Sequence, residues 1–203
     1  MYRAIGAPGS RLTRVTWMLE ELGQPYEIVP AKMRSETMLR YNPTGKVPAL
    51  DDGGLVVTDS AAICAYLGEK HAEADMGPGA GPKGRIEMMS WMLYAQSEFE
   101  APLWMKVRHK FILPEEVRAD VGRATAHDFA AEVEALDAKL GDRTFALGDR
   151  FSAVDVVLGH CGRWARGARF AIASDRVNAY FDRVLSRPAL ARAVAREKEM
   201  AEA

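Results

Sequence analysis

Two dipeptides within residues 42–67 combine groups that could bind a ligand. Because Pro48 follows Val47, the valine must be extended, and the proline, which lacks a backbone donor, is expected to open a strand rather than lie inside one. Asp59 and Ser60 stand at an expected helix start, where the first backbone N–H groups have no partner within the helix. The segment therefore presents strand backbone beside a helix N-terminus, which suits a peptide-like, partly anionic ligand.

Ser10 is the candidate hydroxyl group at a second place in the chain. It follows the apolar run 2–6 and the turn residues 6–9, and it precedes a stretch with apolar residues at helical spacing. Serine is common at the N-cap of a helix, so a capping role is the plainer interpretation of these residues alone.

The elements that position these residues alternate between strand and helix in the first third of the chain. The pattern predicts strands at 2–6 and 25–29 around a helix that ends at Gly23, a short polar helix near 35–40, a hairpin that turns at 51–54, and a helix over 59–71. A strand–helix–strand unit gives parallel neighbours. We therefore expect a small α/β domain at residues 1–76.

A second domain is expected after the Gly/Pro-rich stretch 77–82, because strand patterns nearly vanish beyond it. The predicted division is residues 1–76, a linker at 77–84 and an all-helical domain at 85–203. In the second domain we expect a long helix around 88–99, one from Pro114 to Gly141, and two near 175–186 and after Pro188. Ser152 and Asp155 form a variant capping box before an apolar run.

Composition excludes several classes of function. The chain has 203 residues, 27 basic and 28 acidic, so its net charge of −1 gives no general attraction to nucleic acid or an anionic membrane. Cys64 and Cys161 lie far apart, which disfavours a disulfide scaffold, a zinc site or a dithiol motif. No stretch approaches the ~18 apolar residues of a membrane span. We expect a cytoplasmic protein with no metal.

Taken together, the chain resembles a cytosolic glutathione S-transferase, of the serine type found in bacterial theta-like members. The resemblance is carried by residues 10–15, 17–21 with 25–27, 42–43, 45–50, 59–63 and 151–155. It implies a thioredoxin-like α/β N-terminal domain, an all-α C-terminal domain, a homodimer and a cis peptide bond at Val47-Pro48. It also implies glutathione as co-substrate in a detoxifying transferase.

The chemistry implied by this resemblance is activation of the glutathione thiol. A thiol with a pKa near ~8.5 is only a few per cent thiolate at neutral pH, and the thiolate is the nucleophile. Lowering that pKa by about two units takes roughly 2.7 kcal/mol, and one hydrogen bond to a charged group supplies about 1.5–3 kcal/mol. The family's activating hydroxyl matches Ser10, which would donate to sulfur. Arg14, one helical turn further on, is interpreted as structural.

The remaining site residues would bind the tripeptide. Val47, before Pro48, would pair its backbone with the cysteinyl part, as a strand edge pairs with an added strand. Ser60 and the helix N–H groups would bind the γ-glutamyl carboxylate, and Asp59 would face the ammonium group. Many members have glutamate at this position, so the shorter aspartate changes the reach.

The glycyl carboxylate could be neutralised by Lys46, or equally by Lys32 or Arg34, although a solvated surface charge is as good an interpretation of each. The electrophile would be a small hydrophobic molecule held by the second domain. Four residues are candidates for that wall, although aromatic residues at helical spacing are more often core: Tyr94, Trp104, His109 and Trp164.

Three hypotheses follow from the sequence. The first is a transferase that conjugates glutathione to the electrophile. The second is a glutathione-dependent reductase or isomerase acting on disulfides or peroxides. The third is a non-catalytic protein of the same fold that binds a partner. The presence of Ser10 and of the Val47-Pro48 edge favours the first two.

Overall fold

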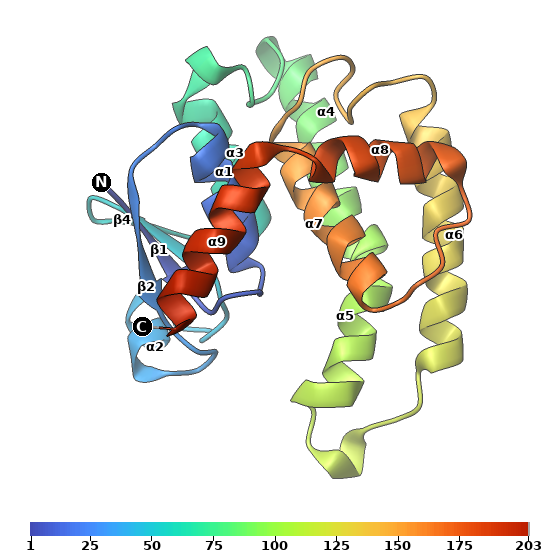
Figure 1. The fold of residues 1–203 in the computed structure, drawn as a ribbon, viewed down its shortest axis with the longest axis horizontal. Helices are drawn as coiled ribbons and strands as arrows, with labels where there is room; N and C mark the ends of the chain where they lie inside the picture. Colours follow the sequence, from blue (N-terminus) through green and yellow to red (C-terminus); the bar gives the residue numbers. More distant parts are fainter. Residues whose placement is uncertain (203) are drawn as a thin grey trace.

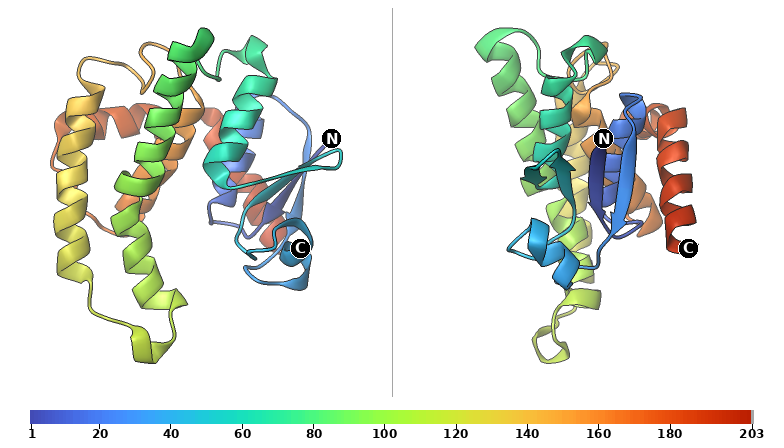
Figure 2. Two further views of the ribbon diagram at one scale, coloured as in Figure 1. Left: turned by 180° about the vertical axis from the view of Figure 1, so that it is seen from behind. Right: turned by 90° about the vertical axis from the view of Figure 1, so that its left-hand side faces the viewer.

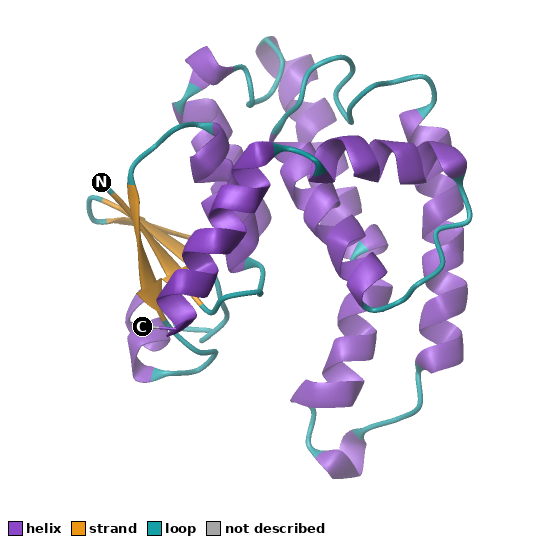
Figure 3. Cartoon of the chain, viewed as in Figure 1, coloured by secondary structure: helices purple, strands orange, loops and turns teal. Residues whose placement is uncertain are grey.

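The computed structural model describes residues 1–202, which form a small α/β part followed by helices (Figures 1 and 3). The first part contains, in order, β1 (Tyr2–Gly6), α1 (Leu12–Glu21), β2 (Tyr26–Pro30), α2 (Glu36–Tyr41), β3 (Ala49–Asp52), β4 (Leu55–Thr58) and α3 (Ser60–Lys70). The helical part contains α4 (Gly81–Tyr94), α5 (Ala101–Val107), α6 (Gly122–Leu140), α7 (Ala153–Gly167), α8 (Asp175–Leu185) and α9 (Pro188–Glu202).

The sheet has the strand order β2-β1-β3-β4. β1 pairs with β2 in parallel, from Tyr2 opposite Tyr26 onward, and β3 pairs antiparallel with both β1 and β4. The parallel pair follows from the strand–helix–strand crossover, and the antiparallel pair from the tight turn between β3 and β4. The predicted fold class, a thioredoxin-like domain followed by an all-helical one, is confirmed.

Helix α1 lies at the centre of the molecule, between the sheet and the helical part (Figure 2). Its residues from Leu12 to Leu19 are buried, including Trp17. A Cβ built on Gly159 of α7 would lie 2.9 Å from the Trp17 ring and 2.5 Å from Val184. Glycine at this position therefore lets α7 approach both α1 and α8.

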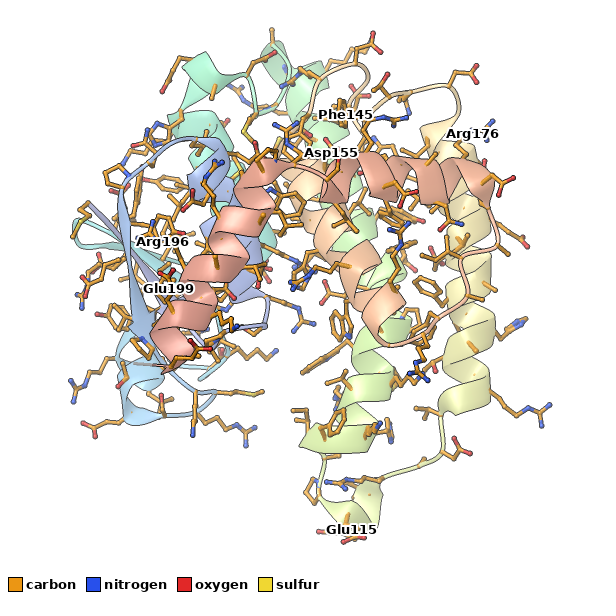
Figure 4. The ribbon with its side chains drawn as sticks, viewed as in Figure 1. Glu115, Phe145, Asp155, Arg176, Arg196 and Glu199 are labelled. Atoms are coloured by element: carbon orange, nitrogen blue, oxygen red, sulfur yellow. The ribbon has the colours of Figure 1, made fainter. Side chains whose placement is uncertain are left out.

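Helix α9 returns from the helical part to cover α1 and β2, as Figure 1 shows. Arg196, labelled beside the sheet in Figure 4, donates to the carbonyl oxygen of Tyr26 at 2.8 Å. Glu20 of α1 accepts from Arg192 at 2.8 Å. The two parts of the chain are therefore joined at both ends of the helical region.

The predicted capping box at the start of α7 is present. Asp155 is buried and accepts from the Ser152 N–H at 2.8 Å and the Ser152 hydroxyl at 2.9 Å. It also accepts from the Ala146 N–H and the Tyr180 hydroxyl, each at 2.8 Å. Figure 4 shows Asp155 beside Phe145, so this one carboxylate fastens the loop before α7 to α8.

The prediction of a helix beginning at Pro114 is wrong, because α6 begins at Gly122. Only a short 3₁₀ turn, Glu115–Val117, follows the proline, and Arg118 is extended. Leu113 is extended because the residue before a proline disfavours the helical region. Residues 114–120 are exposed, so no apolar face stabilises a helix there.

A helical segment that the sequence analysis did not predict precedes this turn. The segment is α5, and Arg108–Ile112 continue it as a π-helical turn. A second π-helical turn, Ala95–Phe99, joins α4 to α5. No helix within residues 1–202 is both long and apolar enough to cross a membrane.

Candidate functional site

A cavity of about 1190 Å³ lies between the α/β part and helices α5 and α7. Its α/β wall contains all six residues that the sequence analysis singled out: Ser10, Lys46, Val47, Pro48, Asp59 and Ser60. The volume exceeds the ~300–1,000 Å³ of a pocket for one small ligand. The cavity therefore has room for a tripeptide and a second molecule.

Ser10 lies in the turn between β1 and α1. Its hydroxyl donates to the carbonyl oxygen of Ala7 at 2.6 Å and accepts from the N–H of Leu12 at 3.1 Å. Arg11, not Ser10, occupies the N-cap position of α1. The serine thus satisfies one helix N–H as a cap would, and its single proton must turn away from Ala7 to reach a ligand.

The Ser10 turn is held by two residues from distant helices. Glu197 of α9, only 3% exposed, accepts from the Gly9 N–H at 2.9 Å and from the hydroxyl groups of Thr13 at 3.0 Å and Thr16 at 2.6 Å. His160 of α7 has its Nε2 at 3.2 Å from the Ser10 carbonyl oxygen. An oxygen acceptor there requires N–H on Nε2. Burial holds the pKa of His160 well below its usual range, so the ring is neutral.

Val47 presents free backbone to the cavity. The Val47-Pro48 peptide bond is cis, as the resemblance implied. Within residues 1–202 the Val47 N–H and C=O make no hydrogen bond. The preceding loop is fixed by Asn42, whose Nδ2 donates to the Lys46 carbonyl oxygen at 2.8 Å and whose Oδ1 accepts from the Thr44 N–H at 3.0 Å. The unpaired edge can therefore accept an extended peptide.

Lys46 is the lysine that lines this part of the cavity. Lys32 and Arg34, the two alternatives for an anionic group, do not line it among the residues described. The geometry therefore favours Lys46 over both.

Asp59 and Ser60 form the start of α3. Asp59 is the N-cap, and its Oδ1 accepts from the N–H groups of Ala61 at 2.9 Å and Ala62 at 3.4 Å. Its backbone has a φ of 70°, a region that non-glycine residues rarely adopt. Within residues 1–202 its Oδ2 accepts only from Gln96, at 3.2 Å, and keeps capacity for another donor. Asp59 is thus both a cap and an available carboxylate.

Ser60 is buried, and its hydroxyl accepts from Arg14 at 3.0 Å. Arg14 is completely buried, and its guanidinium also donates to Gln96 at 2.8 Å and to Glu100 at 2.5 Å. Its structural interpretation therefore fits, and it connects α1 to α3 and to the turn between α4 and α5. With Arg14 as donor, the Ser60 hydroxyl proton is free to point toward a ligand.

Glu100 lies between two arginines. It also accepts from Arg11, whose guanidinium enters the cavity. Burial alone would raise the pKa of Glu100, but the charges of Arg14 and Arg11 outweigh it and hold the pKa below its usual range. The network is therefore ionised, and it fixes the position of Arg11 at the edge of the site.

Sequence reasoning missed most of the supporting residues. Arg11 stands in the motif that carries the resemblance, yet its type alone gave it no role. Glu100, Gln96, His160 and Glu197 contact the site from 37 to 188 positions away in sequence. No spacing rule links residues so far apart, so only the fold brings them together.

Of the four residues proposed to form the wall for the electrophile, two line the cavity and two do not. Trp104 and Trp164 line the cavity. Tyr94 instead donates to the carbonyl oxygen of Glu132 at 3.1 Å, and His109 accepts from the Ala119 N–H at 3.0 Å. These two residues lie outside the cavity lining in the described chain.

The cysteines take no part in this cavity. Cys64 and Cys161 are free thiols and completely buried, and burial raises the pKa of each to about 12. Among residues 1–202 there is also no group of three or more His, Cys, Asp or Glu side chains placed to hold a metal ion.

Residues 5–75 match the family model described as "Glutathione S-transferase, N-terminal domain". The chain is 29% identical over 143 residues to glutathione S-transferase theta-1 of Rattus norvegicus, with 66% of this chain and 60% of the rat protein covered. It is 28% identical over 198 residues to glutathione S-transferase 3 of Zea mays, with 91% and 88% covered.

Solved structures give the same picture of the fold. A glutathione S-transferase from Xylella fastidiosa superimposes with a TM-score of 0.86 at 22% identity, over 98% of this chain and 99% of that one. A sphingomonad glutathione S-transferase complexed with glutathione gives a TM-score of 0.81 at 26% identity, with 97% and 98% covered.

Proposed function

We propose that this chain is a glutathione S-transferase that binds glutathione in the cavity beside Ser10 and joins it through its sulfur to a small electrophile. The match of residues 5–75 to the family's N-terminal domain and the similarity to named glutathione S-transferases support this proposal. One observation carries the proposal. The Ser10 hydroxyl, the unpaired backbone of Val47 and the N-terminus of α3 line a single cavity. We place the enzyme in the serine-type group because a hydroxyl stands at the expected position.

In this proposal Ser10 stabilises the thiolate. Its hydroxyl turns from the Ala7 carbonyl oxygen toward sulfur and donates its proton there. The hydrogen bonds to Glu197 and His160 hold the backbone of the turn in place, so only the hydroxyl proton of Ser10 has to rotate when glutathione binds. The thiol proton leaves to solvent, and the sulfur lone pair attacks the electrophile.

The tripeptide would lie along the α/β wall. The backbone of Val47 pairs with the cysteinyl residue, and Lys46 faces the glycyl carboxylate. The γ-glutamyl carboxylate lies at the Ser60 hydroxyl and the N-terminus of α3, where the helix dipole favours an anion. Asp59 Oδ2 faces the γ-glutamyl ammonium group.

Conjugation is favoured over the reductase and binding-only alternatives. A reductase that uses a dithiol of its own needs an accessible cysteine, whereas both thiols of this chain are completely buried. A reductase for which glutathione supplies the thiols is distinguished by the assay below. A protein that only binds a partner does not require the Ser10 hydroxyl in a fixed turn beside a cavity large enough for two molecules. The two free thiols also fit a reducing compartment, and we expect the enzyme to work in the cytoplasm.

An assay of the wild-type protein with glutathione tests the proposal directly. The second substrate is in turn an activated aryl halide, a hydroperoxide and a mixed disulfide. We expect thioether formation with the halide to exceed turnover of the other two. If only the mixed disulfide is turned over, the protein is a reductase. If glutathione binds but no second substrate is turned over, the protein is the non-catalytic member of the fold.

Replacing Asp59 is expected to weaken glutathione binding more than it slows catalysis. Asp59→Asn keeps a good N-cap but removes the charge that would face the ammonium group. We expect the KM for glutathione to rise about two- to fivefold with kcat nearly unchanged, because a ground-state interaction is lost. Asp59→Ala, which also removes the cap, serves as the comparison. Equal losses in kcat and kcat/KM for Asp59→Asn would contradict the assignment.

A homodimer is the second part of the proposed function. Three apolar residues on one face of α4 are exposed: Ile86 at 62%, Met89 at 56% and Leu93 at 60%. Their spacing of three and four residues places them in one stripe. A contiguous patch of exposed apolar side chains is typical of a protein–protein interface.

Leu93→Asp should therefore separate the dimer. A buried carboxylate at the interface would have no partner, so we expect the dimer dissociation constant to rise more than about tenfold. Light scattering after gel filtration measures the mass. Val117→Asp, at an exposed apolar residue outside α4, is the matched control and should leave the mass unchanged. A monomeric wild type, or a dimeric Leu93→Asp, would contradict α4 as the interface.

A further inference from the structure

The half of the cavity formed by the helical part is strongly basic. Four cations line it: Lys106 on α5, Lys110 on its π-helical continuation, Arg163 on α7 and Arg169 just beyond α7. Within residues 1–202 none of these side chains forms an ion pair with a carboxylate. Lys106 donates to the Ala168 carbonyl oxygen at 3.4 Å, and its ammonium group lies 4.3 Å from the centre of the Phe170 ring. Their positive charge is therefore available to a ligand.

The acidic residues of the cavity do not balance this charge. Glu100 already accepts from both Arg11 and Arg14. Asp59 lies on the opposite wall, where it caps α3. Lys106 is partly buried, whereas Lys110, Arg163 and Arg169 are exposed to solvent, so water screens these charges and each would contribute modestly to binding an anionic ligand.

Two tryptophan side chains, Trp104 and Trp164, line the same half of the cavity as the basic residues. The Arg11 guanidinium lies 4.6 Å from the centre of the Trp104 ring and 5.4 Å from the centre of the Trp164 ring. Both distances are within the range of cation–π contacts. Arg11 is held there by Glu100, so it adds a fixed cation between two indole faces.

Glutathione does not account for these cations. In the proposed arrangement its carboxylates meet Lys46 and the start of α3, all on the α/β wall. The basic residues lie on the helical wall, and the cavity's 1190 Å³ leaves space there for a second molecule.

We propose that the second substrate is an aromatic electrophile that carries an anionic group such as a carboxylate. The ring packs against the parts of Trp104 and Trp164 that Arg11 does not cover, and the anion lies among Lys106, Lys110, Arg163 and Arg169. This inference rests on the proposed transferase activity. For an aryl chloride, the glutathione sulfur lone pair forms the C–S bond, chloride leaves with the C–Cl electron pair, and the thiol proton goes to solvent.

The test uses two matched substrates: an aryl chloride activated by ring nitro groups that carries either a carboxylate or a carboxamide. The two share size and leaving group. At low salt we expect kcat/KM for the carboxylate to be about tenfold higher relative to each compound's uncatalysed rate, because partly exposed ion pairs contribute up to about fivefold each. The preference should fall toward one in about 1 M salt, where the Debye length is about 3 Å.

Two variants locate the anion. In the double variant Lys110→Gln, Arg163→Gln we expect the carboxylate-to-carboxamide ratio to fall from about ten to about two. Arg123→Gln is the matched control, since Arg123 is an exposed helical arginine on α6 outside the cavity lining. It should leave the ratio and the glutathione KM unchanged.

The outcomes separate this inference from the function on which it rests. If both chlorides are conjugated equally well and the ratio is insensitive to salt, the anionic class is wrong and the transferase stands. If neither is conjugated, calorimetry with the two purified S-aryl glutathione conjugates decides: tighter binding of the carboxylated conjugate supports the basic site, and equal binding overturns it.

Discussion

Ser10→Ala is expected to raise the pKa of the bound glutathione thiol by about one to two units from about 6.5, and therefore to slow conjugation at pH 7 about 3- to 25-fold. A hydrogen bond to a charged group contributes about 1.5–3 kcal/mol, and one pKa unit corresponds to 1.36 kcal/mol. The variant loses the donor that favours the anion, so less thiolate is present at neutral pH. The loss should shrink as the pH rises above the thiol pKa, because both proteins then hold thiolate.

Thiolate absorbance of bound glutathione as a function of pH measures this shift without reference to the second substrate. Ser10→Thr, which keeps a hydroxyl, is the matched variant and should recover most of the change. The glutathione dissociation constant should differ little at low pH, where the ligand is a thiol in both proteins. An unchanged thiol pKa in Ser10→Ala would leave the serine with its other role, the hydrogen bonds to Ala7 and Leu12.

Asp155→Ala is expected to produce the largest loss of stability, about 3–5 kcal/mol in the free energy of unfolding. Removal of the carboxylate leaves the buried donors of Ala146, Ser152 and Tyr180 without their acceptor. Each such bond to a charged group is worth about 1.5–3 kcal/mol, and neighbouring losses are not additive. Urea unfolding followed by tryptophan fluorescence and circular dichroism measures the change.

Ser174→Ala provides the comparison for this prediction. Ser174 caps α8 by accepting one N–H, from Val177 at 3.1 Å, and its hydroxyl also donates to the partly exposed Asp137 carboxylate, so its loss should cost about 1–2 kcal/mol. Asp155→Asn should lie between the two, since the amide retains an acceptor. A loss for Asp155→Ala no greater than for Ser174→Ala would show that the loop before α7 folds without this carboxylate.

The sequence predicts the strands and helices of the α/β part well, because each turn there is determined by residues that are neighbours in the chain. The residues at 51–54 and the proline after Val47 determine the hairpin and the backbone before it. The helical part is less predictable. At Pro114 the acidic residues after a proline favour a helix start, but the absence of a buried face prevents the helix, and burial is a property of the whole fold.

The α/β wall of the candidate site is likewise easier to predict from the sequence than its helical wall. Ser10, Val47, Asp59 and Ser60 lie next to turns or helix starts that the sequence marks. The helical wall depends on how α5 and α7 face the α/β part, which periodicity does not determine. The sequence predicted a small hydrophobic second substrate, and the basic residues that lie among the apolar residues of this wall are brought together only by the fold.

The hydrogen bond from the Gly9 N–H to Glu197 determines when, during synthesis of the chain, the Ser10 turn becomes fixed. The two residues are 188 positions apart, and the carboxylate that holds the first turn lies on α9. A growing chain can pair β1, β3 and β4 as soon as residue 58 has left the ribosome, and N-terminal domains generally fold first. The Ser10 turn, however, gains its brace only after residue 197 is made. A nascent chain can thus form the strands next to Val47 long before α9 holds the Ser10 turn. In the proposed function, activation of the thiol therefore waits for the nearly finished protein.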